Sequence, residues 1–467
     1  MRALTPFALL IATILAQFWM LRPLEDADLY TYIVVGRWLP TRASLTEAEL
    51  QTPAYLAWLA SWIFAQVDSW AGLRGVHTLH ILLMIASFTC LCMWQALVMS
   101  RSTGAAPSPL VLGFGMVGAY LVSATNSDAR TQDFTYLSFS LLLLLMERWS
   151  AQADTRRTKV LHAITILALL VFWQNAHATV LLSLPIIATY VVWRQLPWAY
   201  LFLPPLASLC TANGYNIYSW TATNVEISRD LLNISEWRHP WDLTVLNPML
   251  PFWFFTLLIV LAACTPQTRR ILREPTTATL SLLFFVLTLT SARFGALWGF
   301  VSAPLFGAIC AALWPGSLAK TPIKSTNVTR YWILTGISLA LLAANPGRAL
   351  PKDSPLPIFR SLKAQYPTAR IFNYREYGGI LEYLGYPGWS VYIDGRILLF
   401  SPDTWRRYEA IANAHDRSLV DDVVKTHDLL VLHPSYHRSL IEVLRTHDGV
   451  QLLSEDHAVV IFARRRD

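Results

Sequence analysis

Long apolar stretches recur from the first residues of this chain to about residue 344, and they constrain its fold more than any other feature. Several approach the roughly 20 apolar residues that an α-helix needs to cross the hydrocarbon core of a bilayer. Charged residues make up only 14% of the 467 residues, whereas a soluble protein carries about 25%. We therefore expect a polytopic α-helical membrane protein with about eleven transmembrane helices. The expected spans are Ala3–Leu21, Leu79–Met99, Pro109–Ala124, Phe134–Met146, Val160–Trp173, Ala178–Trp193, Tyr200–Thr211, Pro251–Cys264, Ala278–Leu289, Phe294–Trp314 and Tyr331–Ala344.

The basic residues between the spans predict the orientation. If Arg2 lies inside, the same side receives the basic residues of every second loop, and the opposite short loops carry mostly isolated arginines. Because Lys and Arg are enriched in cytoplasmic loops, we predict an inside N-terminus and an outside C-terminus. Residues 22–78 and 213–247 are then long outer-face loops. This pattern also accounts for the net charge of +7 without a nucleic-acid partner.

The composition changes to that of a soluble domain at about Pro351. Short apolar runs there alternate with helical patterns, which predicts a small α/β domain with a partly parallel sheet. We therefore divide the chain into residues 1–348, a multi-span domain, and residues 349–467, a domain outside the membrane. The expected helices are Leu356–Gln365, Gly379–Leu384, Trp405–Ala412, Leu419–Thr426 and Tyr436–Leu444, and the expected strands are Arg370–Asn373, Ser390–Ile393, Leu429–Leu432, Val450–Leu453 and Ala458–Phe462.

An acidic cluster that includes Asp26 and Asp28 follows the first span directly. Carboxylates are costly in hydrocarbon, so these are expected at the interface or in a wet cavity. The apolar residues from Leu29 onward are expected to lie along the bilayer surface as a short helix. Two interpretations stay open: Asp28 caps that helix by accepting a backbone N–H, or one of the two aspartates is a catalytic base.

Polar residues gather at the span ends that this topology assigns to the outer face. Such a group indicates a functional site, and Arg and His opposite carboxylates suit a phosphate-bearing lipid together with a general base. In the alternative, Arg130 and Arg293 reach lipid headgroups or pair with Asp128 and Glu236. The residues expected to bind substrate are Arg130, Gln132, Asn175, His177, Glu236 and Arg293.

The C-terminal domain offers a second group of candidates. Glu376 follows one expected parallel strand, and Asp394 and Arg396 follow the next. Open α/β sheets bind ligands beyond the carboxyl ends of their strands, so these three residues are expected to meet in one substrate-binding crevice. The alternative is a structural salt bridge between Arg396 and Asp394 or Glu376. The histidines of this domain, including His433 and His437 with i,i+4 spacing, lack a zinc motif and are expected at the surface.

Short landmarks extend over most of the chain. They are DxDLxxxxxxGRWL (Asp26–Leu39), RxQ (Arg130, Gln132), WxNxH (Trp173, Asn175, His177), Asn213-x-Tyr215, EWxxP (Glu236, Trp237, Pro240), NYxEYGGxL (Asn373–Leu381) and YIDGR (Tyr392–Arg396). With the spans, they give a layout that resembles the GT-C superfamily of polytopic glycosyltransferases, which includes protein O-mannosyltransferases and the aminoarabinose transferases of lipid A. The chain is more similar still to a group of uncharacterised bacterial membrane proteins related to that superfamily.

The resemblance implies a glycosyltransferase of the bacterial inner membrane. It would move a sugar from a polyprenyl-phosphate donor to a hydroxyl of a glycan, lipid or protein acceptor on the outer face of the membrane. Membrane lipids would surround the protein as further partners. In the pattern Asp26-x-x-x-Tyr30-x-x-Ile33, Asp26 is the better match to the family's base and Asp28 the second choice. Arg130, His177 or Arg293 would stabilise the departing phosphate. A divalent cation stays open as a cofactor.

The chain also departs from the related group. That group often has His where Tyr32 stands, Pro where Gly214 stands and Gly where Ala178 stands, and the missing His weighs against a metal or phosphate role in the first loop. A competing hypothesis from another class is a non-catalytic membrane scaffold whose outer α/β domain binds a partner. A transporter is disfavoured because no inverted repeat is evident.

Overall fold

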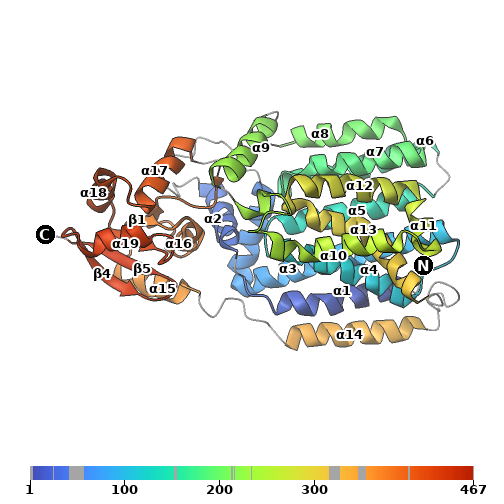
Figure 1. The fold of residues 1–467 in the computed structure, drawn as a ribbon, viewed down its shortest axis with the longest axis horizontal. Helices are drawn as coiled ribbons and strands as arrows, with labels where there is room; N and C mark the ends of the chain where they lie inside the picture. Colours follow the sequence, from blue (N-terminus) through green and yellow to red (C-terminus); the bar gives the residue numbers. More distant parts are fainter. Residues whose placement is uncertain are drawn as a thin grey trace. The chain divides into compact units, whose positions relative to one another are not determined.

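The computed structural model describes residues 4–24, 26–41, 57–151, 155–211, 214, 216–232, 234–314, 327–344, 354–397 and 400–465. The described chain is mostly helical, with a five-stranded sheet in its C-terminal part (Figure 1). Its contacts divide it into two compact units. Unit 1 contains Met1–Pro23, Arg74–Ile217 and Leu232–Ala349, and unit 2 contains Leu24–Leu73, Tyr218–Leu231 and Leu350–Asp467. The domain boundary expected at residue 349 stays a prediction, whereas the contacts group Leu24–Leu73, most of the loop expected on the outer face, with the C-terminal residues.

Unit 1 is built from helices. They are α1 (Leu4–Met20), the part of α3 (Trp58–Thr103) after Leu73, α4 (Pro109–Ser123), α5 (Gln132–Trp149), α6 (Arg156–Ala176), α7 (Ser183–Arg194), α8 (Leu203–Leu209), α10 (Leu246–Ala262), α11 (Pro266–Leu272), α12 (Pro275–Thr290), α13 (Gly295–Leu313) and α14 (Val328–Ala344). Short 3-10 turns join them: η1 (Ala124–Asn126), η2 (Val180–Leu182), η3 (Trp198–Phe202), η5 (Ser235–Trp237) and η6 (Ala292–Phe294). Helix α9 (Asn216–Glu226) begins in unit 1 and continues in unit 2, where the π-helical turn η4 (Ile227–Leu231) follows it.

Every expected span falls on a helix or on a turn-helix pair of unit 1. Among the described residues, three helices are long and apolar enough to cross a membrane: α3, α6 and Ala292–Leu313. The pair α10 and α11, bent by 109°, makes a fourth if it is counted as one span, and six shorter apolar helices accompany them. The helical membrane architecture is thereby supported, while the number of crossings and their orientation stay predictions.

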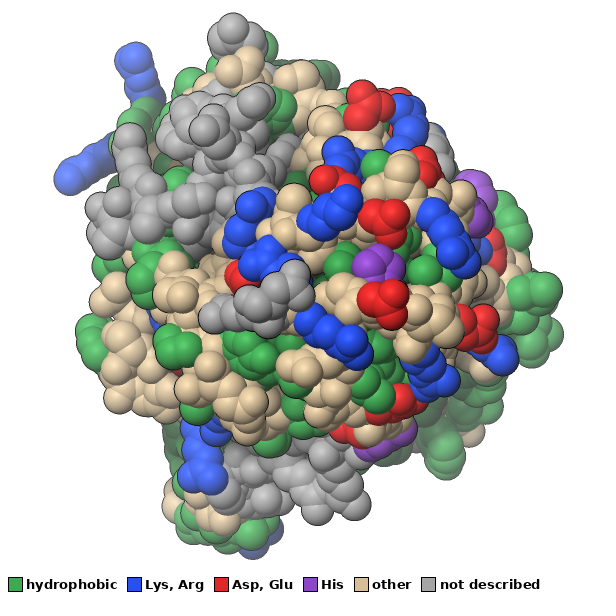
Figure 2. Space-filling view, turned by 90° about the vertical axis from the view of Figure 1, so that its left-hand side faces the viewer, with side chains coloured by type: hydrophobic (Ala, Val, Ile, Leu, Met, Phe, Trp, Pro, Cys, Tyr) green, Lys and Arg blue, Asp and Glu red, His purple; other side chains and the backbone are tan. Residues whose placement is uncertain are grey.

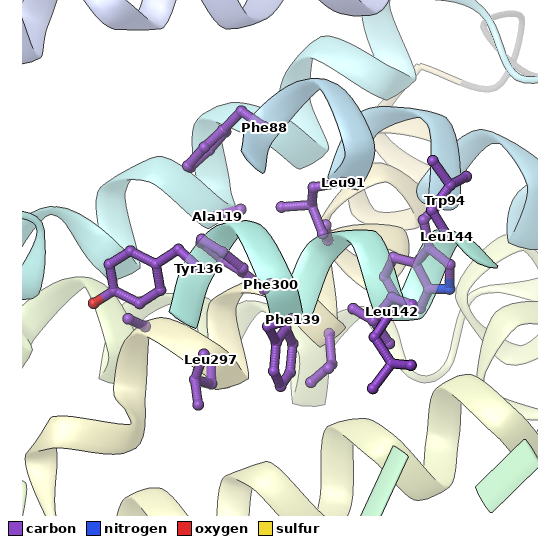
Figure 3. Packing of buried hydrophobic residues seen from close by; sticks show 14 of the residues in the cluster. Phe88, Leu91, Trp94, Ala119, Tyr136, Phe139, Leu142, Leu144, Leu297 and Phe300 are labelled. Atoms are coloured by element: carbon purple, nitrogen blue, oxygen red, sulfur yellow. The ribbon is translucent and has the colours of Figure 1, made fainter. Parts of the chain in front are cut away.

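Helix α13 forms the centre of unit 1. It is apolar on all sides, and each residue from Gly295 to Ala311 is buried, as expected for a helix enclosed by others. The ring of Phe300 on α13 lies 5.4 Å from that of Phe88 on α3 and 5.3 Å from that of Tyr136 on α5 (Figure 3). A hydrogen bond also joins α3 to α13: Gln95 Nε2 of α3 donates to Ala303 O of α13 at 3.3 Å. Such hydrogen bonds help helices associate where apolar burial alone gives little preference.

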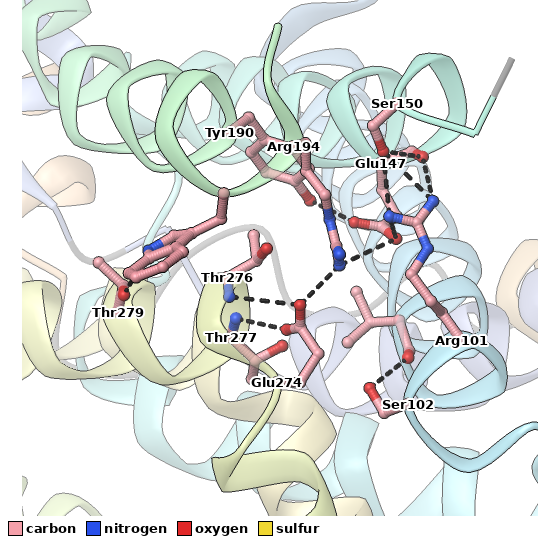
Figure 4. A network of polar contacts seen from close by, with 12 residues as sticks. Arg101, Ser102, Glu147, Ser150, Tyr190, Arg194, Glu274, Thr276, Thr277 and Thr279 are labelled. Carbon is pink, nitrogen blue, oxygen red and sulfur yellow. Dashed lines mark hydrogen bonds and ion pairs between the residues drawn. The ribbon is translucent and has the colours of Figure 1, made fainter. Parts of the chain in front are cut away.

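An ion network ties together one set of helix ends in unit 1 (Figure 4). Arg101 at the end of α3 contacts Glu147 of α5 at 3.0 Å, and Arg194 at the end of α7 contacts Glu274 at 2.6 Å. Glu274 also caps α12 by accepting the N–H groups of residues 276 and 277. Tyr190 donates to Glu147 at 2.9 Å. Arg101 and Arg194, which the predicted orientation places on the inner side, therefore each have a buried carboxylate as a partner. These ion pairs are a structural reason for an arginine at each of the two helix ends.

The C-terminal part of unit 2 is the predicted α/β domain. Its sheet has the order β2-β1-β3-β5-β4, in which β1 pairs in parallel with β2 and β3, and β5 pairs antiparallel with β3 and β4. The strands are β1 (Ala369–Asn373), β2 (Trp389–Val391), β3 (Leu429–Leu432), β4 (Val450–Glu455) and β5 (Val460–Arg464), and the helices are α15 (Leu356–Gln365), α16 (Gly378–Gly385), α17 (Pro402–Ala412), α18 (Arg417–Thr426) and α19 (Arg438–Arg445), with the turn η9 (Arg375–Tyr377).

Helices cover both faces of this sheet. Successive side chains of a strand point to opposite faces. Ile371 of β1 packs in one cluster with Phe359 of α15 and Leu381 of α16, whereas the ring of the next residue, Phe372, lies 5.8 Å from that of Tyr408 on α17. The partly parallel α/β domain predicted from the sequence is confirmed for the described residues.

Helix α2 (Ala27–Thr41) packs against α16 within unit 2. The approach is close at Gly379, where an added Cβ would lie 2.4 Å from Thr31 Oγ1 and 2.5 Å from Ala27 O. Only glycine leaves room for a backbone contact of this kind. The rings of Tyr30 and Tyr383 meet beside it at 5.4 Å. The helix expected from Leu29 onward is confirmed and packs on the C-terminal domain, whereas its position along the bilayer surface stays a prediction.

The first part of α3 also belongs to unit 2. Asp68 there accepts from Arg37 of α2 at 2.5 Å and from the Tyr383 hydroxyl of α16 at 3.1 Å. The helix then breaks at Gly72, whose φ of 62° and ψ of −166° are not helical. The apolar run Pro53–Val67 is helical from Trp58, and its residues before Ala57 lie outside the described chain.

Figure 2 shows basic and acidic side chains interleaved on the face that carries the C-terminal elements. The C-terminal domain has exposed ion pairs, among them Arg407 with Asp422 and Arg445 with Glu455.

Two histidines of the C-terminal domain are buried. The expectation that the histidines of this domain lie at the surface is wrong for His427 and His437, which are 2% and 0% exposed. Apolar and aromatic neighbours bury His437 and lower its pKa to about 3, so that it packs as a neutral ring.

Candidate functional site

Arg130, Glu236 and Arg293 form an ion cluster in unit 1, although they come from three distant parts of the sequence. Arg130 precedes α5, Glu236 lies in η5 and Arg293 lies in η6. Arg130 Nη1 lies 3.3 Å from Glu236 Oε2, and Arg293 Nη1 lies 2.7 Å from Glu236 Oε1. The structure therefore unites three of the residues predicted to bind substrate. It does so through the pairing that we had considered as the structural alternative.

Backbone contacts hold the two turns of this cluster together. Ala292 N donates to Arg238 O at 2.9 Å, and Ser291 Oγ donates to Glu236 O at 3.0 Å. The guanidinium of Arg293 lies over the ring of Trp237, 4.8 Å from its centroid. Stacking on an aromatic face restrains a guanidinium without using its N–H donors. The turns thus fix the direction of Arg293.

Two guanidiniums contact the same carboxylate in this cluster. Burial raises the pKa of Glu236, but Arg293 and Arg130 outweigh it and hold that pKa below its usual value. Glu236 therefore stays ionised at neutral pH. The side chains of Arg130, Glu236 and Arg293 are 25%, 20% and 21% exposed. Two partly exposed guanidiniums that lie close together are suited to binding an anion such as a phosphate.

His177 lies just beyond α6 and contacts hydroxyl groups. Its Nδ1 is 2.8 Å from Thr135 Oγ1 and 3.0 Å from Thr179 Oγ1, and Trp173 Nε1 donates to the same two hydroxyls. Burial, and then the positive charges of Arg293 and Arg130, lower the pKa of His177 to about 3. The imidazole is therefore neutral at physiological pH. It can accept or donate one proton in a hydrogen bond, but it adds no charge to the cluster.

Gln132 and Asn175 make hydrogen bonds that hold helix ends. Gln132 Nε2 donates to the Tyr136 hydroxyl at 2.7 Å, one turn along α5. Asn175 Nδ2 donates to Val171 O at 2.8 Å and to Cys210 O at 2.9 Å, which joins α6 to the end of α8. Both residues therefore have structural partners, and their predicted contact with substrate stays a prediction. Of the landmark Asn213-x-Tyr215, both named residues lie outside the described chain.

A buried histidine–aspartate pair was not foreseen. His80 Nδ1 of α3 lies 2.9 Å from Asp133 Oδ2 of α5, and their side chains are 4% and 0% exposed. The ring of His77 stacks over that of His80 with centroids 6.3 Å apart. The sequence held one signal, because a buried ionisable residue such as Asp133, in the first turn of a largely apolar helix, needs a nearby polar partner.

Asp26 and Asp28 lie at the start of α2 in unit 2. Asp26 Oδ1 accepts the backbone N–H of Asp28 at 2.8 Å. The capping carboxylate is therefore Asp26, which corrects the expectation that Asp28 caps the helix. Asp28 instead lies against the loop after β2: a Cβ added to Gly395 would lie 2.2 Å from Asp28 Oδ1. The DxD and YIDGR landmarks thus meet in three dimensions.

The loop after β2 is held by a buried ion cluster. Arg396 Nε donates to Asp394 Oδ2 at 2.8 Å, and Arg396 Nη2 contacts Glu382 Oε1 of α16 at 2.6 Å. These three side chains are at most 3% exposed. Glu376 is exposed, whereas Asp394 and Arg396 are buried, and the expected substrate-binding crevice of these three residues stays a prediction. The alternative of a structural salt bridge describes Asp394 and Arg396, with Glu382 as the unforeseen third member.

The described residues give no support for a resident metal ion. Among them, no group of three or more His, Cys, Asp or Glu side chains is arranged to hold one. A divalent cation as a cofactor stays a prediction.

Comparisons with known proteins provide a structural context. No protein-family model matches the chain, and no curated protein matches it. Solved structures do. ArnT from Cupriavidus metallidurans in the apo state has a TM-score of 0.57 and 13% sequence identity over 97% of this chain and 96% of that chain. The same protein bound to undecaprenyl phosphate has a TM-score of 0.54 and 13% identity over 98% and 96%.

Two further solved structures show the same likeness. The arabinofuranosyltransferase AftD from Mycobacteria has a TM-score of 0.56 and 14% identity over 99% of this chain and 41% of that chain. The Archaeoglobus fulgidus oligosaccharyltransferase, solved in complex with Zn and sulfate, has a TM-score of 0.52 and 10% identity over 98% and 73%. All are GT-C glycosyltransferases, and this chain has a GT-C-like fold. The resemblance inferred from the landmarks is confirmed at the level of the fold.

Proposed function

We propose that this protein is a membrane glycosyltransferase that moves a sugar from a polyprenyl-phosphate donor to an acceptor hydroxyl on the outer face of the membrane. The observation that carries the proposal is the meeting of Arg130 and Arg293 at Glu236, in a chain with a GT-C-like fold. Two partly exposed guanidiniums at one place suit the phosphate of a lipid donor. The ArnT structure with undecaprenyl phosphate is a precedent for such a lipid on this fold.

The proposed reaction is a single inverting displacement. Asp26 accepts the proton of the acceptor hydroxyl as its oxygen forms a bond to the anomeric carbon of the sugar. The bond from that carbon to the phosphate oxygen breaks, and the polyprenyl phosphate leaves with the electron pair. Arg130 and Arg293 stabilise the charge that develops on this phosphate. The acceptor is a hydroxyl of a glycan, a lipid or a protein.

The competing proposal is a scaffold whose C-terminal α/β domain binds a partner protein. Two observations favour it. Asp394 and Arg396 are engaged in a buried structural ion cluster, and Glu376, which was predicted to bind substrate with them, is exposed at the surface where a partner could contact it. A scaffold requires neither a base nor a phosphate site. The two proposals therefore differ in their dependence on Asp26, Arg130 and Arg293.

Replacing Arg130 or Arg293 with Gln is expected to weaken binding of undecaprenyl phosphate about 10- to 100-fold. This range corresponds to the loss of one hydrogen bond to a charged group, about 1.5–3 kcal/mol. Binding is measured on the purified protein in detergent, with undecaprenol as the ligand that lacks the phosphate. Arg238→Gln is the matched control, because Arg238 directly follows the turn that carries Glu236 and pairs with Asp242 instead. Equal binding by all three variants would assign Arg130 and Arg293 to lipid headgroups.

A C-terminal reporter tests the orientation. An enzyme that is active only in the cytoplasm should be silent when fused after Asp467 and active when fused after Lys320, which lies in an expected inner loop. Activity of the first fusion would place the C-terminal domain in the cytoplasm. The proposal of an outer-face reaction would then be withdrawn.

A further inference from the structure

The loop after β2 approaches the start of α2 more closely than any side chain would permit. An added Cβ on Gly395 would lie 2.2 Å from Oδ1 of Asp28 and 3.3 Å from its carboxyl carbon. The φ of Gly395 lies outside the left-handed region, so the backbone conformation does not demand glycine here. The requirement for glycine comes from the carboxylate of Asp28.

This loop is rigidly held. The backbone N–H of Arg396 donates to Asp394 Oδ1 at 2.7 Å, and the side chain of Arg396 is fixed between Asp394 and Glu382. A buried guanidinium with two carboxylate partners keeps its geometry, because breaking either contact leaves a buried charge uncompensated. Gly395 lies between two of these residues and cannot move without disturbing them.

Asp28 passes this constraint on to Asp26. Its carboxylate rests against Gly395, and its backbone N–H donates to Asp26 Oδ1 at 2.8 Å. One carboxylate oxygen of Asp26 is therefore directed by the residue whose side chain touches the loop. We propose that the Asp394–Arg396 loop is a positioning element for the proposed base, with Gly395 and Asp28 as the residues through which it orients the Asp26 carboxylate.

The inference rests on the proposed transfer reaction, and it adds the C-terminal domain to the parts of the chain that set up the chemistry. A general base acts only from within hydrogen-bond reach of the proton that it removes. A misplacement by about 1 Å can cost about 100-fold in rate. The loop then acts on the turnover rate through geometry, without touching the substrate.

Gly395→Ala tests this directly. The added methyl group should displace the Asp28 carboxylate and lower kcat about 10- to 100-fold. The KM for the lipid donor should change by less than about twofold, because the substitution does not alter the residues proposed to bind the donor phosphate. Gly336→Ala is the matched control, because an added Cβ there meets nothing within 4 Å. Amide exchange of the peptides that cover α2 and residues 369–397 establishes that the variant is folded.

A double-mutant cycle separates this route from a general loss of packing. In an Asp28→Ala background, Gly395→Ala should have little further effect on kcat or on the unfolding midpoint, since no carboxylate remains to be displaced. In an Asp28→Asn background, which keeps the shape, it should keep its full effect. If Gly395→Ala alone fails to fold, the Asp28→Ala background should restore folding. Additive losses in both backgrounds would overturn the proposal.

The outcomes also separate this inference from the proposed function. If Asp26→Asn retains transfer, the assignment of the base fails and the positioning role with it. If Asp26→Asn loses transfer but Gly395→Ala has wild-type kcat, only the positioning role is overturned. Non-additivity of the unfolding midpoints is a readout that needs no activity.

Discussion

Asp26→Asn is expected to lower the rate of sugar transfer by about 10²- to 10⁴-fold, the range that a general base contributes. Asparagine has nearly the same shape as aspartate and is an equally good helix cap. Its side-chain oxygen can still accept the N–H of Asp28, which lies 2.8 Å from Asp26 Oδ1. The substitution therefore removes the ability to take up a proton and keeps the start of α2 in place. The measurement is single-turnover transfer from polyprenyl-phosphate-linked sugars to an acceptor.

Two comparisons make this result specific. Asp26→Ser also keeps a capping oxygen without a base, so it should lose transfer to a similar extent, with an unchanged unfolding midpoint. Undecaprenyl phosphate binding should survive both substitutions, because the proposed phosphate site consists of Arg130 and Arg293. If the Asn variant transfers sugar normally, Asp26 is only a cap. A protein that carries out its cellular role with Asn at both Asp26 and Asp28 would favour the scaffold.

Much of the fold follows from local pattern in the sequence. The apolar stretches set the helices of unit 1, and α15 begins and ends at the predicted residues, Leu356 and Gln365. Strand β3 likewise covers Leu429–Leu432 as predicted. These elements are continuous apolar or strongly amphipathic runs with clear turn residues between them. Such runs specify helix or strand without help from distant parts of the chain.

The association of Leu24–Leu73 with the C-terminal residues could not be predicted in the same way. It depends on close backbone approaches at Gly379 and Gly395. A glycine in a sequence shows that a close approach is permitted, but it does not name the partner. These two glycines belong to the NYxEYGGxL and YIDGR landmarks. The helix that packs against them, α2, lies several hundred residues earlier in the chain.

The candidate site was predicted in its residue types and only in part in its pairings. Arginines at the span ends were recognised, yet both proved to share Glu236, because three turns that the sequence separates are neighbours in unit 1. In unit 2, the sequence predicts Glu376 as a neighbour of Arg396 because Glu376 follows a strand, whereas the carboxylate of α16 that pairs with Arg396 is Glu382. The signal for Glu382 was a single carboxylate in the otherwise apolar helix α16. A buried carboxylate must have a partner, and the spacing along the chain does not show which one.

Removing the partner of Glu382 should have the second large effect. Arg396→Met keeps much of the side-chain volume but leaves Asp394 and Glu382 as buried carboxylates without their shared guanidinium. Breaking a buried ion pair from one side costs about 3–5 kcal/mol. Because Asp394 and Glu382 hold the loop after β2 to α16, we expect amide protection of residues 369–397 to fall by a corresponding factor of about 10² to 4 × 10³. Arg407→Met is the matched control, because its pair with Asp422 is half exposed and worth less than about 1 kcal/mol.

The pH dependence of this loss identifies its electrostatic origin. Burial and then the charge of Asp394 raise the pKa of Glu382 well above its usual value, although Arg396 opposes the shift. A carboxyl group with a raised pKa in the folded state takes up a proton on folding, so its contribution favours the folded state at low pH and is lost as the pH rises through the folded-state pKa. Without Arg396 that pKa rises further. The destabilisation by Arg396→Met should therefore be larger at pH 8 than at pH 5, and Glu382→Gln in the Arg396→Met background should recover part of the protection at pH 8. A loss that is equal at both pH values, with no recovery by Glu382→Gln, would mean that Arg396 stabilises the loop by packing alone.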